Sequence, residues 1–288
     1  MSRRNNLERL GAARNENSPG GVKQGFDFSF VSPTTFVELP SGGKYYPENH
    51  PLHGVESVEI KEMTAHEEDI LADANLQKSG VAINKMIQNI VVDKRINTDS
   101  LLVGDKNAIT IAARMHGYGA DYKTSVSCPS CGTKNEHEFD LRSLEHKESV
   151  LDNEVSHVEG RIFQFKLPRT DFNVRVKLLN SKEALQMNKS VQKARSGRAN
   201  ANLQTTFLKI VLHSVQNKAD DLWYEDRPVI EKFADSIPAV DAMYIRAQYK
   251  QLAPDMNMAQ DFECAECGFS QEMEVPLNAD FFWPDARI

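Results

Sequence analysis

The sequence predicts an α+β fold, in which helices pack beside short antiparallel strands and two C-x-x-C hairpins together form a split zinc ribbon. Three observations predict it. Short stretches in which apolar and polar residues alternate indicate strands, and longer stretches with apolar residues every three or four positions indicate helices. The four cysteines of the chain form two copies of one motif.

The two cysteine motifs read Cys128-Pro129-Ser130-Cys131-Gly132 and Cys264-Ala265-Glu266-Cys267-Gly268. Aligned without a gap, they also share two later glutamates and a closing leucine. The glycine after each second cysteine permits a sharp turn that aims backbone amides at sulfur. Alternation around the first motif predicts a hairpin with the cysteines at its tip.

Each motif supplies two ligands, whereas structural zinc takes four. We therefore expect one structural Zn²⁺ ion, bound by Cys128, Cys131, Cys264 and Cys267. The 132 residues between the motifs far exceed the roughly 15 to 20 of an ordinary zinc ribbon. Redox chemistry and four buried free thiols stay open as alternatives. No residue at a fixed offset could activate a water, which favours a closed structural site over a catalytic one.

Composition and charge exclude some classes of function. The chain has 288 residues, of which 40% are hydrophobic and 26% charged, as in ordinary globular proteins. No apolar run approaches the 18 or so residues of a membrane helix, and no signal-peptide pattern opens the chain, so we expect no membrane partner. Cysteines in metal-binding spacing fit a reducing, cytoplasmic setting.

The net charge of −7 is unevenly distributed. Residues 1–25 carry five basic and two acidic residues, a net +3, so the remaining chain carries −10. An acidic body disfavours nucleic-acid binding, which needs a basic face. The alternative function is a zinc-ribbon regulator that binds nucleic acid through Lys193, Arg195, Arg198 and Lys209.

Four segments follow from these patterns. Residues 1–25 are polar, without apolar periodicity, and we expect a disordered basic arm. Residues 26–145 form a strand-helix region ending in the first cysteine motif, and 146–255 form a hairpin plus a helical insert. Residues 256–288 carry the second motif and an aromatic tail, Phe281-Phe282-Trp283-Pro284, that fits either core packing or docking.

The elements of the first half begin with a turn at Gly42-Gly43, after which Tyr45-Tyr46 fits either the core or an interface. Ser41-Gly42-Gly43-Lys44 is not a phosphate-binding loop, because the required glycine spacing and following helix are missing. Thr64 and Glu67 form a capping box at a helix start, and Asp105 is a candidate N-cap. We expect a strand over 55–63 and helices over 64–80, over 81–91 and from Asp105 onward.

The second half contains two alternating stretches, 163–167 and 172–178, that predict a hairpin. Residues 144–153 predict a short helix or a link, and Trp223-Tyr224 a turn or short strand. We expect helices from Ser181, over 207–215, near 226–235 and over 238–250, with a flexible basic break at 196–202.

Catalytic motifs are missing from the sequence. The eight histidines have no catalytic partner at a recognisable spacing, and G-x-S-x-G, H-E-x-x-H and G-x-G-x-x-G do not occur. We therefore expect no enzyme, no catalytic residue, no cofactor besides zinc and no small-molecule substrate.

Several segments together resemble a known family. They are residues 36–46, residues 58–71, Leu101-Leu102-Val103-Gly104-Asp105 with the helix to Arg114, and Tyr118-Gly119 leading into the first cysteine motif. In these the chain resembles the baseplate hub and hub-assembly proteins of T-even-like contractile-tailed bacteriophages.

The resemblance implies a structural or chaperone-like assembly protein of the baseplate hub, made late and without a reaction of its own. Its implied partners are other baseplate and hub proteins and the tape-measure protein. Its implied location is the host cytoplasm during assembly and the tail baseplate of the virion.

Overall fold

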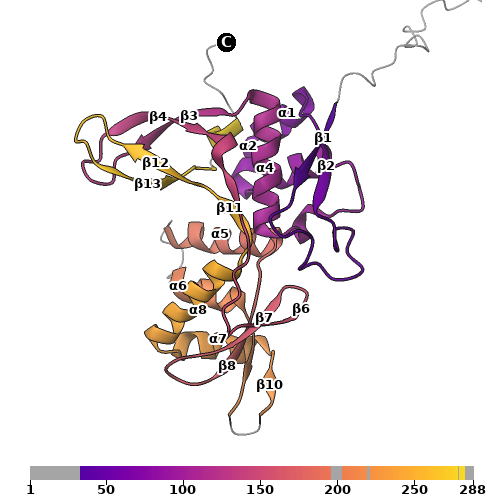
Figure 1. The fold of residues 1–288 in the computed structure, drawn as a ribbon, viewed down its shortest axis with the longest axis vertical. Helices are drawn as coiled ribbons and strands as arrows, with labels where there is room; N and C mark the ends of the chain where they lie inside the picture. Colours follow the sequence, from indigo (N-terminus) through magenta and orange to yellow (C-terminus); the bar gives the residue numbers. More distant parts are fainter. Residues whose placement is uncertain (1–32, 196–202, 219–220, 278, 283–288) are drawn as a thin grey trace, which may run out of the picture. The chain divides into compact units, whose positions relative to one another are not determined.

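The computed structural model describes residues 33–195, 203–218, 221–277 and 279–282, and Figure 1 shows their fold. From Pro33 onward the chain forms one compact unit. The expected basic arm (1–25), the expected break at 196–202 and Trp283-Pro284 lie outside the described residues. The division into four segments stays an interpretation of the sequence.

The described helices and strands alternate irregularly along the chain (Figure 1). The helices are α1 (Ala65–Ala72), α2 (Ala74–Ser79), α3 (Ala82–Ile90), α4 (Val103–Tyr118), α5 (Ser181–Arg195), α6 (Leu203–Val211), α7 (Arg227–Ser236) and α8 (Ala239–Leu252). The strands are β1 (Thr34–Glu38), β2 (Ser57–Lys61), β3 (Asp121–Ser127), β4 (Lys134–Asp140), β5 (Glu145–Lys147), β6 (Ser156–Glu159), β7 (Ile162–Lys166), β8 (Asn173–Lys177), β9 (Leu212–Gln216), β10 (Trp223–Tyr224), β11 (Asp255–Asn257), β12 (Ala259–Glu263) and β13 (Ser270–Glu274).

All strand pairs among the described residues are antiparallel. One sheet has five strands in the order β10-β9-β8-β7-β6, and four two-stranded sheets pair β1 with β2, β3 with β4, β5 with β11, and β12 with β13. Helices beside short antiparallel strands confirm the predicted α+β class.

The five-stranded sheet contains the expected hairpin, β7–β8, in which Phe165 lies opposite Val174. Its apolar side chains are buried, because alternate residues of a strand point to the same face. Helices α7 and α8 cover this face through aromatic contacts of Phe172 with Phe233 and of Phe165 with Tyr244. This part of the chain has an ordinary hydrophobic core.

Helix α4 connects distant parts of the chain, since it contacts β1, α3, α5 and β11. Gly104 lets β11 approach closely, because a Cβ there would lie 2.1 Å from the carbonyl oxygen of Pro254. Arg114 is buried and donates to the carbonyl oxygens of Phe281 (2.8 Å) and Gly119 (2.6 Å). Phe281 is itself buried, so this part of the aromatic tail belongs to the core.

Two expectations about helix starts and lengths are wrong. The predicted helix over 64–80 is broken at Asp73, whose extended backbone ends α1 and whose carboxylate caps α2 by accepting from Asn75 and Leu76. Its capping box of Thr64 and Glu67 is confirmed.

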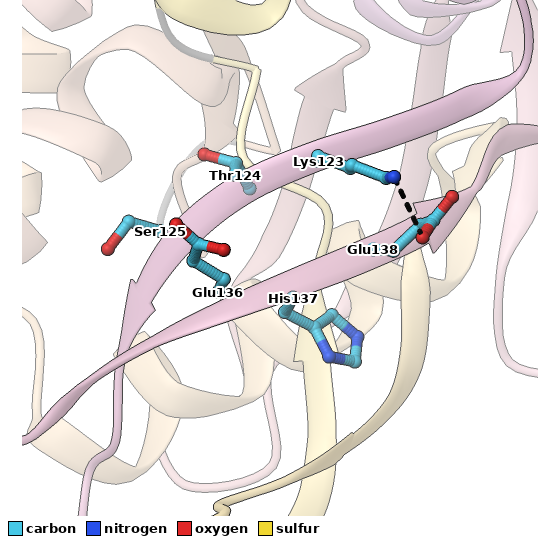
Figure 2. Close-up of a pocket in the computed structure, with 6 residues that line it drawn as sticks. All are labelled: Lys123, Thr124, Ser125, Glu136, His137 and Glu138. Atoms are coloured by element: carbon cyan, nitrogen blue, oxygen red, sulfur yellow. Dashed lines mark ion pairs between the residues drawn. The ribbon is translucent and has the colours of Figure 1, made fainter. Parts of the chain in front are cut away.

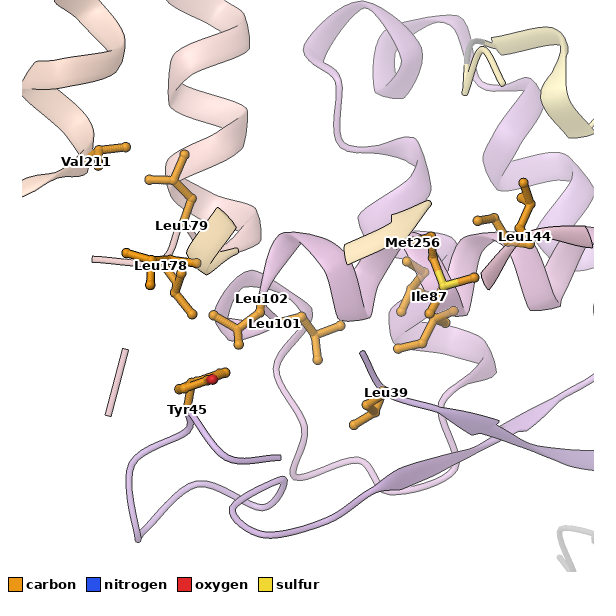
Figure 3. Packing of buried hydrophobic residues seen from close by; sticks show 14 of the residues in the cluster. Leu39, Tyr45, Ile87, Leu101, Leu102, Leu144, Leu178, Leu179, Val211 and Met256 are labelled. Carbon is orange, nitrogen blue, oxygen red and sulfur yellow. The ribbon is translucent and has the colours of Figure 1, made fainter. Parts of the chain in front are cut away.

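Asp105 is not an N-cap, because α4 begins two residues earlier. It is buried and accepts hydrogen bonds from the Ser41 hydroxyl and the Tyr46 hydroxyl, both at 2.7 Å. Tyr46 and Tyr45 are core residues, and Figure 3 shows Tyr45 among the buried cluster. The predicted turn at Gly42-Gly43 is confirmed by their positive φ angles of 55° and 71°.

Two further expectations in the second half are wrong. The helix expected over 207–215 ends at Val211, and the next residues form β9, where Val215 pairs with Val174. Residues 145–147, expected in a helix or link, form β5 against β11. In both places strand pairing with distant residues decides the local structure.

Candidate metal centre

The two cysteine motifs form the tips of two hairpins, β3–β4 and β12–β13, with the same local hydrogen bonds. In the first, the Cys128 amide donates to Thr133 and the Gly132 amide to Cys128, both at 2.9 Å. The Cys264 and Gly268 amides make the equivalent bonds at 2.9 Å in the second. Gly132 and Gly268 have φ angles of 73° and 66°, a backbone that favours glycine.

The fold brings the two tips together, although they are far apart in sequence. The four sulfur atoms all lie within 4.8 Å of one another, with Cys128 3.8 Å from Cys267 and Cys131 3.7 Å from Cys264. Four sulfurs about 2.3 Å from one tetrahedral zinc ion would be about 3.8 Å apart. The donors and their spacing therefore fit a metal ion such as zinc. No other comparable cluster of metal-binding side chains occurs among the described residues.

Asn135 joins the two hairpins beside the sulfurs. It lies on β4, is buried, and accepts from the Ala265 amide at 3.1 Å while its side-chain nitrogen lies 3.5 Å from the Cys264 sulfur. A neutral amide this close to sulfur orients a ligand without competing for the metal. Sequence alone does not identify Asn135, because nothing in its residue type or spacing links it to a cysteine 129 positions away.

Hydrogen bonds favour the thiolate form of two of the four cysteines, Cys264 and Cys131. The amides of Cys267 and Glu266 lower the pKa of Cys264 to about 6. Hydrogen bonds from Thr133 lower the pKa of Cys131. Hydrogen bonds to a charged form stabilise it, and a metal requires that form.

Side-chain contacts below the tips fix the two hairpins against each other. The Gln260 side chain accepts from the Asp140 amide (3.1 Å) and donates to its carbonyl oxygen (2.8 Å). The ring of His137 packs edge-on against Phe139 and Phe262, at centroid distances of 4.5 and 5.5 Å. The His137 ring therefore packs between the two hairpins.

The β3–β4 hairpin carries an open pocket of about 370 Å³, shown in Figure 2. Lys123 and Glu138 form an ion pair across it at 3.6 Å, and both side chains are largely exposed. Exposed pairs of this kind contribute little to stability. The pocket is lined by Lys123, Thr124, Ser125, Glu136, His137 and Glu138.

The basic residues of the alternative function are only partly described. Lys209 pairs with Asp235 at 2.7 Å, whereas Arg198 and the side chains of Lys193 and Arg195 lie outside the described residues. The segment 259–274, which holds the second cysteine motif, has five acidic residues and no basic one.

Across the described part of the chain, no helix has the length and apolar character needed to span a membrane. Searches of the curated proteins and of the solved structures gave no match. A protein-family comparison matches residues 32–283 to the family described as T4 bacteriophage base plate protein, which covers most of the chain and both cysteine motifs. The chain therefore belongs to the T4 bacteriophage base plate protein family.

Proposed function

We propose that this protein is a structural or assembly component of the baseplate hub of a contractile phage tail, stabilised by one zinc ion and without a reaction of its own. The observation that carries the proposal is the family match over residues 32–283. The family supports a structural role and a place in the virion tail. The hub position, a chaperone-like role and the partners, namely hub proteins and the tape-measure protein, are our proposal.

Zinc is proposed to be held by Cys128, Cys131, Cys264 and Cys267. The ion would connect two hairpins that enclose 132 residues of intervening chain. Because ligands from both ends of this segment are needed, metal binding and folding of the two hairpins are coupled. The proposed consequence is a rigid platform on which other baseplate proteins assemble.

Metal content is the first test. The purified chain should contain one zinc ion per molecule by elemental analysis. A chelator should remove this ion, and both hairpins should then lose their ordered structure. A chain that purifies without metal under reducing conditions, yet keeps both hairpins protected in hydrogen exchange, would refute the zinc proposal but not the baseplate role.

The partner test is co-expression of the tagged chain with the other tail proteins of its phage, followed by purification and mass spectrometry. We expect hub proteins to be enriched over the other baseplate proteins. Enrichment of peripheral baseplate proteins instead would contradict the hub position. Recovery of no tail protein would refute the proposed role in the baseplate.

The alternative is a zinc-ribbon regulator that binds nucleic acid. The chain outside the first 25 residues has a net charge of −10, and the second hairpin is acidic. Both features disfavour binding to the negatively charged phosphates of nucleic acid. Binding to duplex DNA should therefore be weak at about 0.15 M salt. Tight binding that weakens steeply between about 50 and 200 mM salt would favour the regulator instead.

A further inference from the structure

An open groove of about 690 Å³ lies between the second cysteine hairpin and helices α6 and α8. Phe207 of α6 and Tyr249 of α8 line it and pack edge to face, with 5.2 Å between their ring centroids. Of the described residues that line the groove, only Met256 is buried, so β11, which leads from α8 toward the hairpin (Figure 1), forms its base. Leu203 at its border is 46% exposed. Apolar side chains of a partner can fill an open groove of this kind.

The two walls of the groove carry opposite charges. Arg246 and Lys250 lie about one turn apart on α8, and Glu272 and Glu274 lie two residues apart on β13. Within the described part of the chain, none of these four side chains takes part in an ion pair. Both walls therefore leave their charges available to a partner.

Two further charged residues line the groove, and both are bonded within the chain. Lys147 donates to the carbonyl oxygen of Lys250, so it adds positive charge to the α8 wall. Asp255, on β11, accepts from the side-chain amide of Asn107 at 2.9 Å. The charge pattern of the groove is therefore a basic wall on α8 and an acidic wall on β13, with the carboxylate between them already bonded.

The acidic wall contains a repulsive pair in the free chain. Glu272 lies directly opposite Asp261 in the pairing of β12 with β13, and like charges directly opposite each other destabilise a strand pair. The whole segment 259–274 has five acidic residues and no basic one. Cations of a partner placed along this wall would relieve the repulsion.

The three surfaces of the groove fit a helix better than a strand. The two cations on α8 are four residues and about 6 Å apart along the helix axis, and the two glutamates on β13 are about 7 Å apart along the strand. A helix presents residues i and i+4 on one side at a similar spacing of about 6 Å. It can turn one side to the base and one to each wall, whereas the side chains of a strand point in only two opposite directions.

We infer that this groove binds an amphipathic helix of another structural protein of the phage tail. The apolar side of that helix lies on β11, its basic side along Glu272 and Glu274, and its acidic side along Arg246 and Lys250. That the partner is a tail protein rests on the proposed function, whereas the chemistry of the helix rests on the groove.

Synthetic peptides and the full chain test the chemistry of the occupant. The probe is an alanine-rich peptide of about 18 residues, long enough to form a helix alone, with leucines spaced three and four apart, lysines on one flank and glutamates on the other. By fluorescence anisotropy it should bind at least about tenfold more tightly than peptides with lysine on both flanks or glutamate on both. Equal or tighter binding of the lysine-only peptide would overturn the inference, because the basic wall would then contribute nothing.

Charge reversal of the acidic wall tests the position of the site. Glu272→Lys/Glu274→Lys should weaken binding of the mixed peptide at least about tenfold and strengthen binding of the glutamate-only peptide. The matched control is Glu136→Lys/Glu138→Lys, at the corresponding exposed positions of the first hairpin, which do not line the groove. It makes the same change of net charge and should alter both affinities less than about twofold. Equal effects of the two variants, or no gain for the glutamate-only peptide, would overturn the assignment.

A crosslinking experiment tests the partner. A photo-crosslinking residue at position 203 of the full chain, co-expressed with the other tail proteins of its phage, should crosslink to one of them. The crosslinked segment should have apolar residues every three or four positions and flanks of opposite charge. A crosslink to a second copy of this chain, a segment without this pattern, or tail proteins recovered without a crosslink from position 203 would each overturn the inference and leave the baseplate role untouched. Recovery of no tail protein would refute the proposed function and this partner with it.

Discussion

The cysteine hairpins and the five-stranded sheet are stabilised in different ways. In the sheet, β7 and β8 each bury two alternate apolar residues, and β9 buries Leu212 and Val215. In the second hairpin, β12 buries only Phe262 and β13 is largely exposed. Cys264, next to β12, is as deeply buried as Phe262. Sulfur thus occupies the position where the sheet would place a hydrophobic side chain.

This difference shows where a metal is useful. A two-stranded hairpin is at best marginally stable alone, because it buries too little apolar surface to offset its lost conformational entropy. The sheet buries more apolar surface, through β7, β8 and β9 and through the contacts of α7 and α8. Four convergent thiolates can supply what the hairpins lack, since structural zinc contributes directly to folding. Loss of the metal and loss of core packing should therefore affect different regions of the molecule.

The strongest test removes half of the cysteine cluster. Cys264→Ser/Cys267→Ser should reduce zinc from about one ion per chain to nearly none, because two thiolates cannot hold structural zinc tightly. Hydrogen exchange should then accelerate in both hairpins, 121–140 and 259–274, while β7 and β8 keep most of their protection. The zinc-binding free energy at stake is on the order of 10 kcal/mol.

The matched control for this variant is Ser130→Ala/Glu266→Ala, which alters the exposed middle residues of the same two turns and spares every sulfur. It should keep the metal and the exchange protection. Faster exchange in β12–β13 alone after loss of the cysteines would contradict the coupling of the two hairpins.

Replacing a large buried side chain of the sheet by alanine should destabilise the sheet and leave the cysteine cluster able to bind metal. Phe163→Ala, at a fully buried position, should lower the free energy of unfolding by about 3–5 kcal/mol, because it leaves a cavity. The folded fraction should still bind one zinc ion. Urea unfolding followed by circular dichroism measures the loss. Phe36→Ala, at an exposed phenylalanine, should change stability by less than about 0.5 kcal/mol; similar losses for both would show that burial is not the cause.

The contact between the hairpins can be tested without touching a sulfur. Asn135→Ala should weaken zinc binding by about 10- to 100-fold, because this side chain orients Cys264 and holds the Ala265 amide. Competition with a chromophoric chelator measures the affinity. Lys134→Ala, at the exposed neighbouring residue, should leave it unchanged, and equal affinities of both variants would remove Asn135 from the site.

The smallest expected effect on stability comes from Asp105, which lies in neither the cysteine hairpins nor the five-stranded sheet. Burial raises the pKa of its carboxyl group in the folded chain. Between the unfolded pKa near about 3.9 and the raised folded pKa, the folded state holds more protons, so this group lowers stability as pH rises. Asp105→Asn should remove this contribution.

The measurement is urea unfolding of both chains at several pH values. The parent should gain stability relative to Asp105→Asn as pH falls through the folded pKa, with no further gain below about 4. A parallel pH dependence of the two chains would show that the carboxyl group titrates equally in both states.

Much of the fold followed from local patterns. The β7–β8 hairpin, the capping box of Thr64 and Glu67 and the turn at Gly42-Gly43 are all specified by residues within a few positions of each other. The errors at Val215 and Asp105 share one cause. Val215 and Asp105 were assigned from their neighbours in sequence, whereas a strand in one case and two distant hydroxyl groups in the other determine their structure.

For the candidate metal centre too, some features follow from the sequence and others only from the tertiary structure. The sequence alone identified the four cysteines as one set, because the two motifs are near copies and each supplies half of a tetrahedral ligand set. Only the tertiary structure decided that the two thiol pairs meet within 4.8 Å and that Asn135 joins the two hairpins beside them. The physical reason is that residue type and spacing set what a short segment can do, whereas contacts across more than 100 residues depend on how the whole core packs.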